Sequence, residues 1–237
     1  MHNDDLVALS KIPLFAGLSL AQLEELTQAG FVHALPTGAT LFEQGEMPGF
    51  LHVILRGAVA VVGTAPADQA ADAPAHREAI ITVFGANDAL IAPAVLLTLP
   101  YMMSARVIEA ARIAFLPAQA IRDLLANHAG FAQESALMLA RHWRLLVREL
   151  KDLKLRSVSQ RLAGYLLSLA PAAQTAPAQV ALPFDRRVLA SWLGTTPENL
   201  SRSIAQLGGL GVAIRGRKVH IADPDLLHRF SREDNLR

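Results

Sequence analysis

The chain contains no cysteine among its 237 residues. This absence excludes disulfide bonds, a catalytic thiol and an iron–sulfur cluster held by cysteines of this chain. The sequence also has no apolar run approaching the roughly 18 uninterrupted residues expected of a membrane-spanning helix. The amino-terminal segment MHNDDLVALSK is acidic and has no apolar core behind a basic stretch, so it does not resemble a secretory signal. We therefore expect a cytoplasmic protein that has no membrane partner.

Sequence motifs of common enzyme classes are missing as well. There is no G-x-S-x-G nucleophile elbow, no H-E-x-x-H zinc pair and no glycine-rich phosphate loop. Glu24 and Glu25 lie on a predicted amphipathic surface helix, and Asp88 follows Gly85 in a predicted turn, where aspartate is common. The sequence therefore predicts neither an enzyme nor a metal site.

Residues 31–116 have a sequence pattern that is typical of a small β-domain. Short β-rich runs such as FVHAL, TLFEQ and AIITVFG alternate with Gly, Pro, Asn and Asp, which predicts a compact antiparallel barrel or sandwich. A short helix is predicted before this region, around Leu20–Ala29. Residues 64–77, TAPADQAADAPAHR, lack apolar periodicity, and we expect them to form an exposed, mobile hairpin loop.

A long helix is predicted from Phe131 to Leu155, because this stretch has no internal Gly or Pro and its apolar residues recur at spacings of three and four. The opposite face carries apolar residues too. One face can pack on the β-structure and the other on the same helix of a second copy, which predicts a parallel homodimer; a helix packed only within its own domain is the alternative. The expected dimer-interface residues are Leu139, Trp143, Leu146, Leu150 and Leu153.

Residues 184–207 predict two short amphipathic helices joined by a tight turn. Gly194 permits the turn, Thr196 can cap the second helix, and Pro197 at its first position has no N–H to leave unbonded. The second helix presents polar side chains at its N-terminal end, which suits entry into the major groove of B-DNA. The run GRKVHI that follows predicts a basic β-hairpin wing. An ordinary αα-corner inside a core would give a similar helix pattern.

The distribution of charge favours DNA binding over an αα-corner. Residues 156–237 carry 11 Lys and Arg against 6 Asp and Glu, whereas residues 1–155 carry 11 against 15. A basic C-terminal third is the electrostatic footprint expected opposite a phosphate backbone. The expected DNA contacts on the second helix are Glu198, Ser201, Arg202, Thr196 and Asn199. The expected phosphate contacts are Arg186, Arg187, Arg215, Arg217 and Lys218.

The order of a β-rich sensor domain, a long helix and a winged helix-turn-helix resembles the CRP/FNR family of bacterial transcription regulators over nearly the whole chain. Specific similarities are PLFAGLSLAQLEEL, the FEQGE turn, ILRGAVAVV and RLAGYLLSLA. The resemblance implies an α+β fold with an antiparallel β-roll of the cyclic-nucleotide-binding type in residues 1–130, a dimerisation helix in 131–155 and a winged helix-turn-helix in 156–237. It also implies double-stranded DNA, a second copy and RNA polymerase as partners.

The segment from Glu198 to Arg202, ENLSR, resembles the E-x-x-S-R recognition-helix pattern of the fumarate–nitrate-type branch, which includes regulators that respond to nitrogen oxides. In that branch the matching Glu and Arg read half-sites similar to TTGA…TCAA, and the Ser assists. The resemblance implies these roles for Glu198, Arg202 and Ser201. Pro197 stands where the cyclic-AMP receptor branch has an arginine, which favours the specificity of the fumarate–nitrate branch.

The sensor region departs from the pattern of the cyclic-AMP branch. Ala92-Pro93 stands where that branch has Gly-Glu, and Met103-Ser104 where it has Arg-Ser, so the carboxylate for the ribose and the guanidinium for the phosphate are missing. Arg106 would share a strand face with Ser104 and could supply a guanidinium. We expect an effector other than cyclic AMP. The residues expected around its pocket are Leu90, Ile91, Val95, Leu96, Leu97, Met102, Met103, Ser104 and Arg106.

The same apolar run could take haem, as in gas-sensing relatives, or it could be ordinary core. The candidate axial ligands are His33, His52, His128 and His142, none of which lies in a recognisable haem motif. For the whole chain, the alternative to a sequence-specific regulator is a sensor or adaptor that dimerises without reading a specific DNA sequence.

Overall fold

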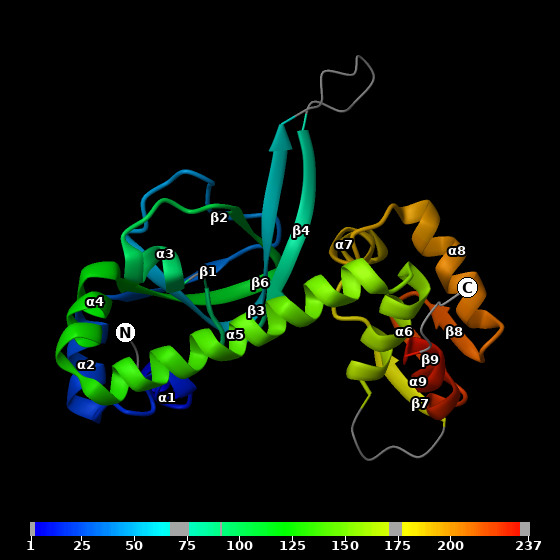
Figure 1. The fold of residues 1–237 in the computed structure, drawn as a ribbon. Coiled ribbons are helices and arrows are strands. Elements are labelled where there is room, and N and C mark those ends of the chain that lie inside the picture. The colour runs from blue at the N-terminus through cyan, green and yellow to red at the C-terminus, as the bar shows by residue number, and fades with distance from the viewer. Residues whose placement is uncertain (1–2, 67–75, 91, 171–176, 233–237) are drawn as a thin grey trace. The chain divides into compact units, whose positions relative to one another are not determined.

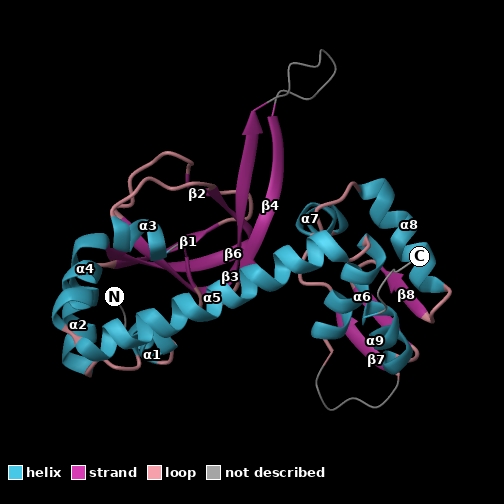
Figure 2. Cartoon of the chain, viewed as in Figure 1, coloured by secondary structure: helices cyan, strands magenta, loops and turns pink. Residues whose placement is uncertain are grey.

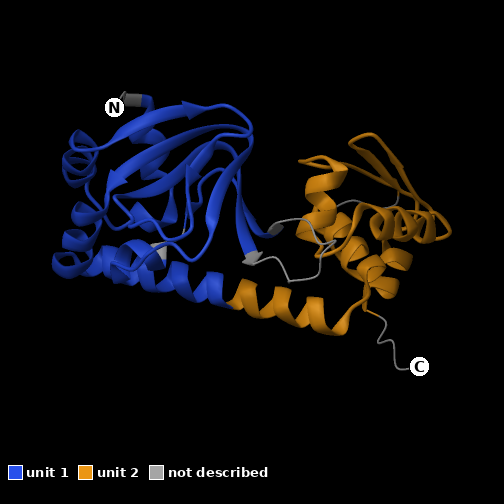
Figure 3. Cartoon of the chain, turned by 90° about the horizontal axis from the view of Figure 1, so that it is seen from above, with its two compact units in different colours: residues 1–143 blue, residues 144–237 orange. Residues whose placement is uncertain are grey.

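The computed structural model describes residues 3–66, 76–90, 92–170 and 177–232. The chain divides into two compact units, residues 1–143 and 144–237 (Figure 3). The first unit is a sheet with helices around it, and the second combines helices with a small sheet (Figure 2). Among the helices in these described ranges, none is long and apolar enough to cross a membrane.

An antiparallel sheet forms the centre of the first unit. Its strands are β1 (Phe31–Leu35), β2 (Thr40–Phe42), β3 (Phe50–Pro66), β4 (His76–Phe84), β5 (Ala89–Leu90) and β6 (Ser104–Pro117). Strands β1, β6, β3 and β4 are neighbours in that order, while β2 pairs with β6 and β5 pairs with β3. The β3–β6 pairing runs from Phe50 opposite Pro117 to Val62 opposite Ser104, which makes it the backbone of the unit.

A bulge bends β3 at Gly57. This residue has a φ of +86°, and a Cβ added to it would lie 2.4 Å from the carbonyl oxygen of Ala110 in β6. Only glycine satisfies both conditions without strain. The register between β3 and β6 shifts on both sides of the bulge, and such shifts increase the local twist of a strand pair. The bulge therefore helps the two long strands to curl into a roll.

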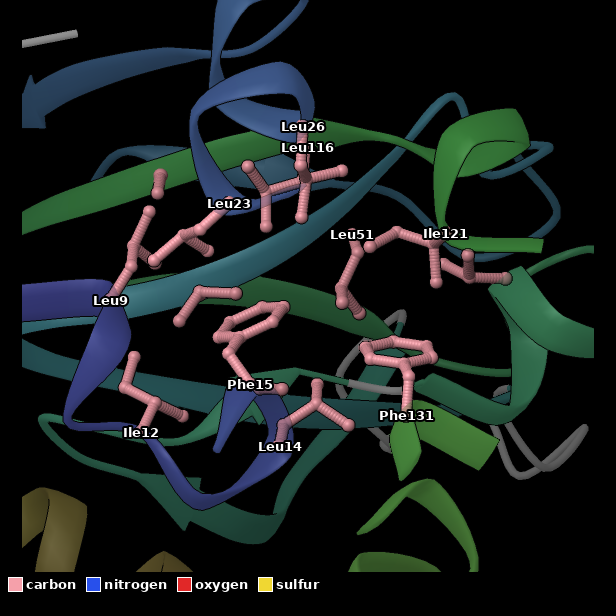
Figure 4. Packing of buried hydrophobic residues seen from close by; sticks show 14 of the residues in the cluster. Leu9, Ile12, Leu14, Phe15, Leu23, Leu26, Leu51, Leu116, Ile121 and Phe131 are labelled. Carbon is pink, nitrogen blue, oxygen red and sulfur yellow. The ribbon is translucent and has the colours of Figure 1, made fainter. Parts of the chain in front are cut away.

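Helices cover one face of this roll. They are α1 (Asn3–Ser10), the short 3₁₀ helix η1 (Pro13–Phe15), α2 (Leu20–Gln28), α4 (Ala118–Asn127) and the start of α5 (Ala129–Leu155), and α3 (Ala92–Leu97) lies between β5 and β6. Their apolar side chains bury a cluster with Leu51 of β3 and Leu116 of β6 (Figure 4). Within it the rings of Phe15 and Phe131 stack with centroids 6.2 Å apart, which attaches the start of α5 to the amino-terminal helices.

The opposite face of the same strands builds a second cluster inside the roll. Because side chains alternate along a strand, Leu51 and Val53 of β3 face the helices, whereas Ile54 packs with Phe42 and Tyr101 in the interior. Both faces of the central strands are therefore buried, so the sheet is the core of the unit rather than a surface layer.

The second unit contains the remaining elements. They are the end of α5, α6 (Val158–Ser168), β7 (Ala178–Ala181), α7 (Arg186–Trp192), α8 (Pro197–Gly208), β8 (Val212–Arg215), β9 (Lys218–Ile221) and α9 (Pro224–Arg232). Strands β7, β9 and β8 form an antiparallel sheet in that order, and α6 packs against α8 and α9 (Figure 1). Leu162 of α6, Leu189 of α7 and Leu200 of α8 are fully or almost fully buried in this core.

The structure confirms the predicted fold class: an α+β chain with a β-roll, a long helix and a helix-turn-helix with a small sheet. The long helix begins at Ala129, two residues before the predicted start, and ends at Leu155 as expected. The helices α1, α4 and α9 and the strand β7 were not anticipated, because their short amphipathic patterns are ambiguous without their packing partners.

The predicted boundaries of the hairpin loop at residues 64–77 were wrong. Thr64–Pro66 belongs to β3 and His76 to β4, and Thr64 pairs with Glu78 across the ladder. Strand pairing uses backbone groups, so an Ala- and Pro-rich composition did not stop it before residue 66. Residues 67–75, the centre of that predicted loop, lie outside the described residues.

Candidate nucleic-acid interface and effector site

Helices α7 and α8 form a helix-turn-helix whose helices are capped by side chains. Asp185 accepts a hydrogen bond from the Val188 N–H at 2.9 Å, and Thr196 accepts one from the Asn199 N–H at 3.3 Å. Between the helices Gly194 has a φ of +63°, in the region that favours glycine. The two caps and the glycine together determine where α8 starts and which way it runs.

Helix α8 has one buried face and one exposed face. Leu200, Ser203 and Leu207 are buried against the rest of the unit. The exposed polar residues in its first two turns are Glu198, Asn199, Ser201 and Arg202. The exposed side of the helix N-terminus therefore offers an acceptor, an amide, a hydroxyl and a guanidinium, which are the groups that read base edges in a major groove.

The carboxylate of Glu198 is held in its ionised form. A hydrogen bond from its own backbone N–H lowers its pKa, a hydrogen bond from the Thr196 hydroxyl adds to this effect, and the positive charge of Arg202 contributes further. Ionised carboxylates only accept hydrogen bonds, as a contact with the amino group of cytosine requires. The Ser201 hydroxyl donates to the Pro197 carbonyl oxygen at 2.9 Å, which leaves its own oxygen able to accept.

Exposed basic side chains stand on the elements that contact α8. Arg186 and Arg187 occupy the first two positions of α7, and Arg215 and Lys218 lie at the turn between β8 and β9. Both α7 and β8 pack against α8. These cations therefore lie on α7 and on the β8–β9 hairpin of the unit that contains α8.

Arg217, another predicted phosphate contact, is bonded inside the protein. Its Nε donates to the Leu182 carbonyl oxygen at 2.8 Å, and its Nη2 donates to the Pro183 carbonyl oxygen. The Leu182 N–H in turn donates to the Arg217 carbonyl oxygen at 2.7 Å. The side chain thus ties the wing turn to the segment that leads into α7. Sequence reasoning could not see this role because the partners are 34 and 35 residues apart.

Sequence reasoning also missed a polar contact behind α8. The buried Ser159 of α6 donates to Gln206 Oε1 of α8 at 2.6 Å. The signal in the sequence is a pair of polar residues, Ser159 and Gln160, shortly before the apolar positions of α6. This bond holds the second half of α8 while its first half stays exposed.

The sensor roll places Ser104 next to a carboxylate. Its buried hydroxyl donates to Glu43 Oε2 at 2.8 Å and accepts from the Gln44 N–H at 3.0 Å. Three residues before Ser104, Tyr101 stacks on Phe42 with ring centroids 3.8 Å apart. Burial and the nearby Glu46 raise the pKa of the Tyr101 hydroxyl to about 12, so that ring stays neutral. The one hydroxyl that matches the cyclic-nucleotide pattern is thus bonded to an acidic group.

Arg106, the residue two positions after Ser104 that could replace the missing guanidinium, is engaged elsewhere. Its guanidinium forms two hydrogen bonds with Glu78 of β4, at 2.9 and 2.8 Å, and both side chains are partly exposed. This bidentate pair occupies the two donors with which an arginine binds a phosphate. Ser104 and Arg106 are therefore each bonded to a carboxylate.

Two protein-family models match the chain, one for each unit of the fold. The model described as the Crp-like helix-turn-helix domain matches residues 160–230, and the model described as the cyclic nucleotide-binding domain matches residues 32–128. Together the two matches cover more than half of the chain. The "CRP-like cAMP-activated global transcriptional regulator" of Mycobacterium tuberculosis is 25% identical over 228 residues, which cover 94% of this chain and 98% of that protein. The chain belongs to the CRP/FNR family of transcription regulators.

Solved structures share the fold of this CRP/FNR regulator at lower identity. FixK2 from Bradyrhizobium japonicum matches with a TM-score of 0.69 at 19% identity, covering 85% of this chain and 96% of that one. The c-di-GMP responsive global regulator CLP of Xanthomonas campestris matches with a TM-score of 0.67 at 17% identity, covering 86% and 99%. The family consists of DNA-binding transcription regulators with an effector-binding domain, not of enzymes.

The regulator's predicted pocket residues do not share one surface. Leu90 and Val95 are buried in the two different core clusters. Leu97 and Met102 are 66% and 81% exposed. Leu96 and Met103 are partly buried, and Ile91 lies outside the described residues. The apolar run therefore divides between core and surface.

The four candidate haem ligands of the regulator are also dispersed. His52 is buried between Phe42 and Phe115, with ring centroids 5.4 and 4.8 Å away, and burial lowers its pKa to about 4. The others lie elsewhere: His128 Nδ1 accepts from the Phe131 N–H at 3.1 Å, His142 packs on Phe84, and His33 is exposed on β1. In the ranges that the structure describes, no three metal-binding side chains gather.

Proposed function

We propose that this CRP/FNR regulator is a homodimer that reads a palindrome similar to TTGA-N6-TCAA, with Glu198, Ser201 and Arg202 at the base edges. The observation that carries the proposal is the exposed end of α8, where an ionised Glu198 and Arg202 lie one helical turn apart behind a capped N-terminus. A carboxylate suits cytosine N4, and a guanidinium suits guanine O6 and N7. This pairing supports the specificity of the fumarate–nitrate branch.

The homodimer is supported by the apolar residues along α5. Trp143, Leu150 and Leu153 are 69%, 53% and 54% exposed in the single chain, and Leu146 is 47% exposed. Leu139, nearer the start of the helix, is partly buried. Side chains of this size at heptad spacing are stabilised when a second helix covers them. A parallel pair would present two recognition helices to successive turns of the same DNA face.

The effector is proposed to be something other than a cyclic nucleotide. Glu43 beside Ser104 would repel a phosphate, and the guanidinium of Arg106 is taken by Glu78. The names of the relatives, cAMP-activated in one case and c-di-GMP responsive in another, support a fold that accepts different signals. RNA polymerase is the further partner that a regulator of this family would contact on the promoter.

A titration of fluorescently labelled duplexes tests the proposal. Wild-type protein is added to a duplex with TTGA-N6-TCAA and to a duplex of the same composition in scrambled order, at a fixed salt concentration. We expect the palindrome to bind at least about a thousandfold more tightly, as specific sites usually do. Equal affinity for the two duplexes would favour the alternative, a dimeric sensor or adaptor that does not read sequence.

A further inference from the structure

Arg161 of α6 connects the ends of two other helices in the second unit. Its Nη1 donates to the Arg156 carbonyl oxygen at 2.8 Å, directly after the last residue of α5. Its Nη2 donates to the carbonyl oxygen of Leu193, the residue that closes α7, at 2.7 Å. Both acceptors belong to the set of carbonyls that helix ends leave without intrahelical partners. One guanidinium therefore satisfies the C-terminal ends of α5 and α7 together.

The electrostatics of this arrangement favour a cation there. Helix C-termini carry partial negative charge, and two of them meet at Arg161. Burial lowers the pKa of Arg161, and the charge of Asp152 on α5 partly offsets this effect. Asp152 also forms an ion pair with Arg156, with 3.2 Å between Oδ1 and Nε. A neutral side chain at position 161 would leave both carbonyl oxygens without their cationic donor, whereas Asp152 would keep its ion pair with Arg156.

The connection reaches the start of the recognition helix within a few residues. Leu193 is followed by Gly194 and Thr195, and then by Thr196, the N-cap of α8. A Cβ added to Gly194 would lie 3.2 Å from Leu153 Cδ1, so the turn itself rests on the last turns of α5. The position of the turn between α7 and α8 is therefore tied directly to the end of the proposed dimer helix.

We propose that Arg161 is a positioning residue that sets the orientation of the recognition helix relative to the dimer helix, and thereby the spacing of half-sites that the dimer accepts. The inference rests on the proposed function, because spacing has meaning only for a dimer that reads two half-sites. One base pair added to or removed from the spacer moves a half-site by about 3.4 Å and rotates it by roughly 35°. A firmly held turn rejects such a change, and a loosened turn tolerates it.

The experiment compares spacers in variants of the full chain. Duplexes carrying TTGA and TCAA separated by five, six or seven base pairs are titrated with wild type, Arg161→Met and the matched control Arg229→Met, which changes an exposed arginine of α9. We expect wild type and Arg229→Met to prefer the six-base-pair spacer by at least about tenfold. We expect the preference of Arg161→Met to fall to about threefold or less, with the largest part of the change at the non-optimal spacers.

Two measurements distinguish a positioning role of Arg161 from a merely structural one, namely thermal unfolding and spacer preference. Thermal unfolding of each variant, followed by circular dichroism, shows whether the second unit still folds. If Arg161→Met does not fold, Arg161→Lys is used, which keeps the charge but replaces the planar fork by a single ammonium, and its spacer preference should also fall. A folded variant that binds all spacers more weakly but keeps the wild-type preference overturns the inference. A wild type that does not distinguish palindrome from scrambled duplex refutes the proposed function instead.

Discussion

At the scale of single residues, the exposed end of α8 shows how a few side chains build the proposed recognition surface. Thr196 caps the helix and also donates a hydrogen bond to Glu198, so the same hydroxyl starts the helix and orients the carboxylate. Arg217, by contrast, is a basic residue whose guanidinium is committed to the carbonyls of Leu182 and Pro183. The type and the exposure of a residue are therefore not sufficient to assign it as a DNA contact. The hydrogen bonds that its side chain already forms within the protein must be considered too.

Replacing Arg202 by alanine should change specificity rather than abolish binding. Removal of one base-reading guanidinium is expected to cost about 1–3 kcal/mol on the TTGA-N6-TCAA duplex and to relax preference at one base-pair position. The measurement is a titration of duplexes in which that position is varied through all four bases. An unchanged order of preference would show that Arg202 does not read a base.

Lys218 and Arg217, neighbours on the wing, should behave differently. Lys218→Ala is expected to weaken all duplexes alike and to lower the slope of log affinity against log salt by about one. Arg217→Ala should leave that slope unchanged and lower the melting temperature, because it removes bonds between the wing and the segment before α7. Salt titrations and thermal melts of both variants check this, and a matching fall in slope for Arg217→Ala would contradict it.

His52 should make the stability of the first unit depend on pH. Burial lowers its pKa from 6.5 to about 4, so the unfolded chain binds a proton more readily than the folded one. The contribution is complete above pH 6.5 and is lost as the pH falls toward 4, by about 2 kcal/mol between pH 7 and pH 5. Urea unfolding at both pH values should show a smaller loss for His52→Leu than for wild type. The exposed-histidine control His33→Leu should keep the full loss, and an equal loss in both variants would disprove the effect.

At the scale of elements, local signals in the sequence were sufficient for most of the candidate interface. The N-cap and first-position proline at residues 196–197, the turn glycine at 194 and the apolar spacing of α5 act within a few residues, so the sequence predicted these elements. The wing hairpin also lies where predicted, with Arg215 opposite Lys218.

Features that depend on distant pairing could not be predicted in this way. Ser104 meets Glu43 across 61 residues, and Arg161 reaches Leu193 across 32. Nothing in the local pattern around either residue specifies its partner. The apolar run from Leu90 to Met103 shows the same limit, because only the folded strands reveal that Leu90 faces the core while Met102 faces solvent.

The exposed apolar residues of α5, which are Trp143, Leu146, Leu150 and Leu153, should control the formation of the homodimer. Leu150→Lys is expected to convert the dimer into a monomer at micromolar concentrations, because it places a charge at the centre of the proposed helix pair. The same substitution at Leu20, which is 68% exposed on α2, should leave the assembly unchanged. Sedimentation equilibrium distinguishes the two states. A Leu150→Lys protein that remains dimeric would show that the dimer interface does not lie on this face of α5.

At the scale of the whole molecule, one helix belongs to both units. α5 begins in the core of the first unit, where Phe131 is fully buried, and ends in the second unit beside Arg161 and the turn of the helix-turn-helix. A signal that changes the pairing of two α5 helices could therefore shift the population of dimers whose recognition helices match the DNA.

Cyclic AMP should not act as that signal. Glu43 bonds to Ser104 and Glu78 to Arg106, so a cyclic phosphate would meet carboxylates where it needs cations. Isothermal titration of the protein with cyclic AMP is expected to give no saturable heat, and the nucleotide should leave the affinity for the palindrome unchanged. A micromolar dissociation constant together with tighter DNA binding would show that the roll rearranges to accept it.

Native mass spectrometry of the protein bound to short duplexes tests the central claim most directly. The account predicts two chains on a duplex with both half-sites of TTGA-N6-TCAA, and a large loss of this complex when the bases of one half-site are scrambled. Observation of one chain per duplex, or of the same occupancy on intact and scrambled sites, would contradict a dimer that reads DNA through paired α8 helices.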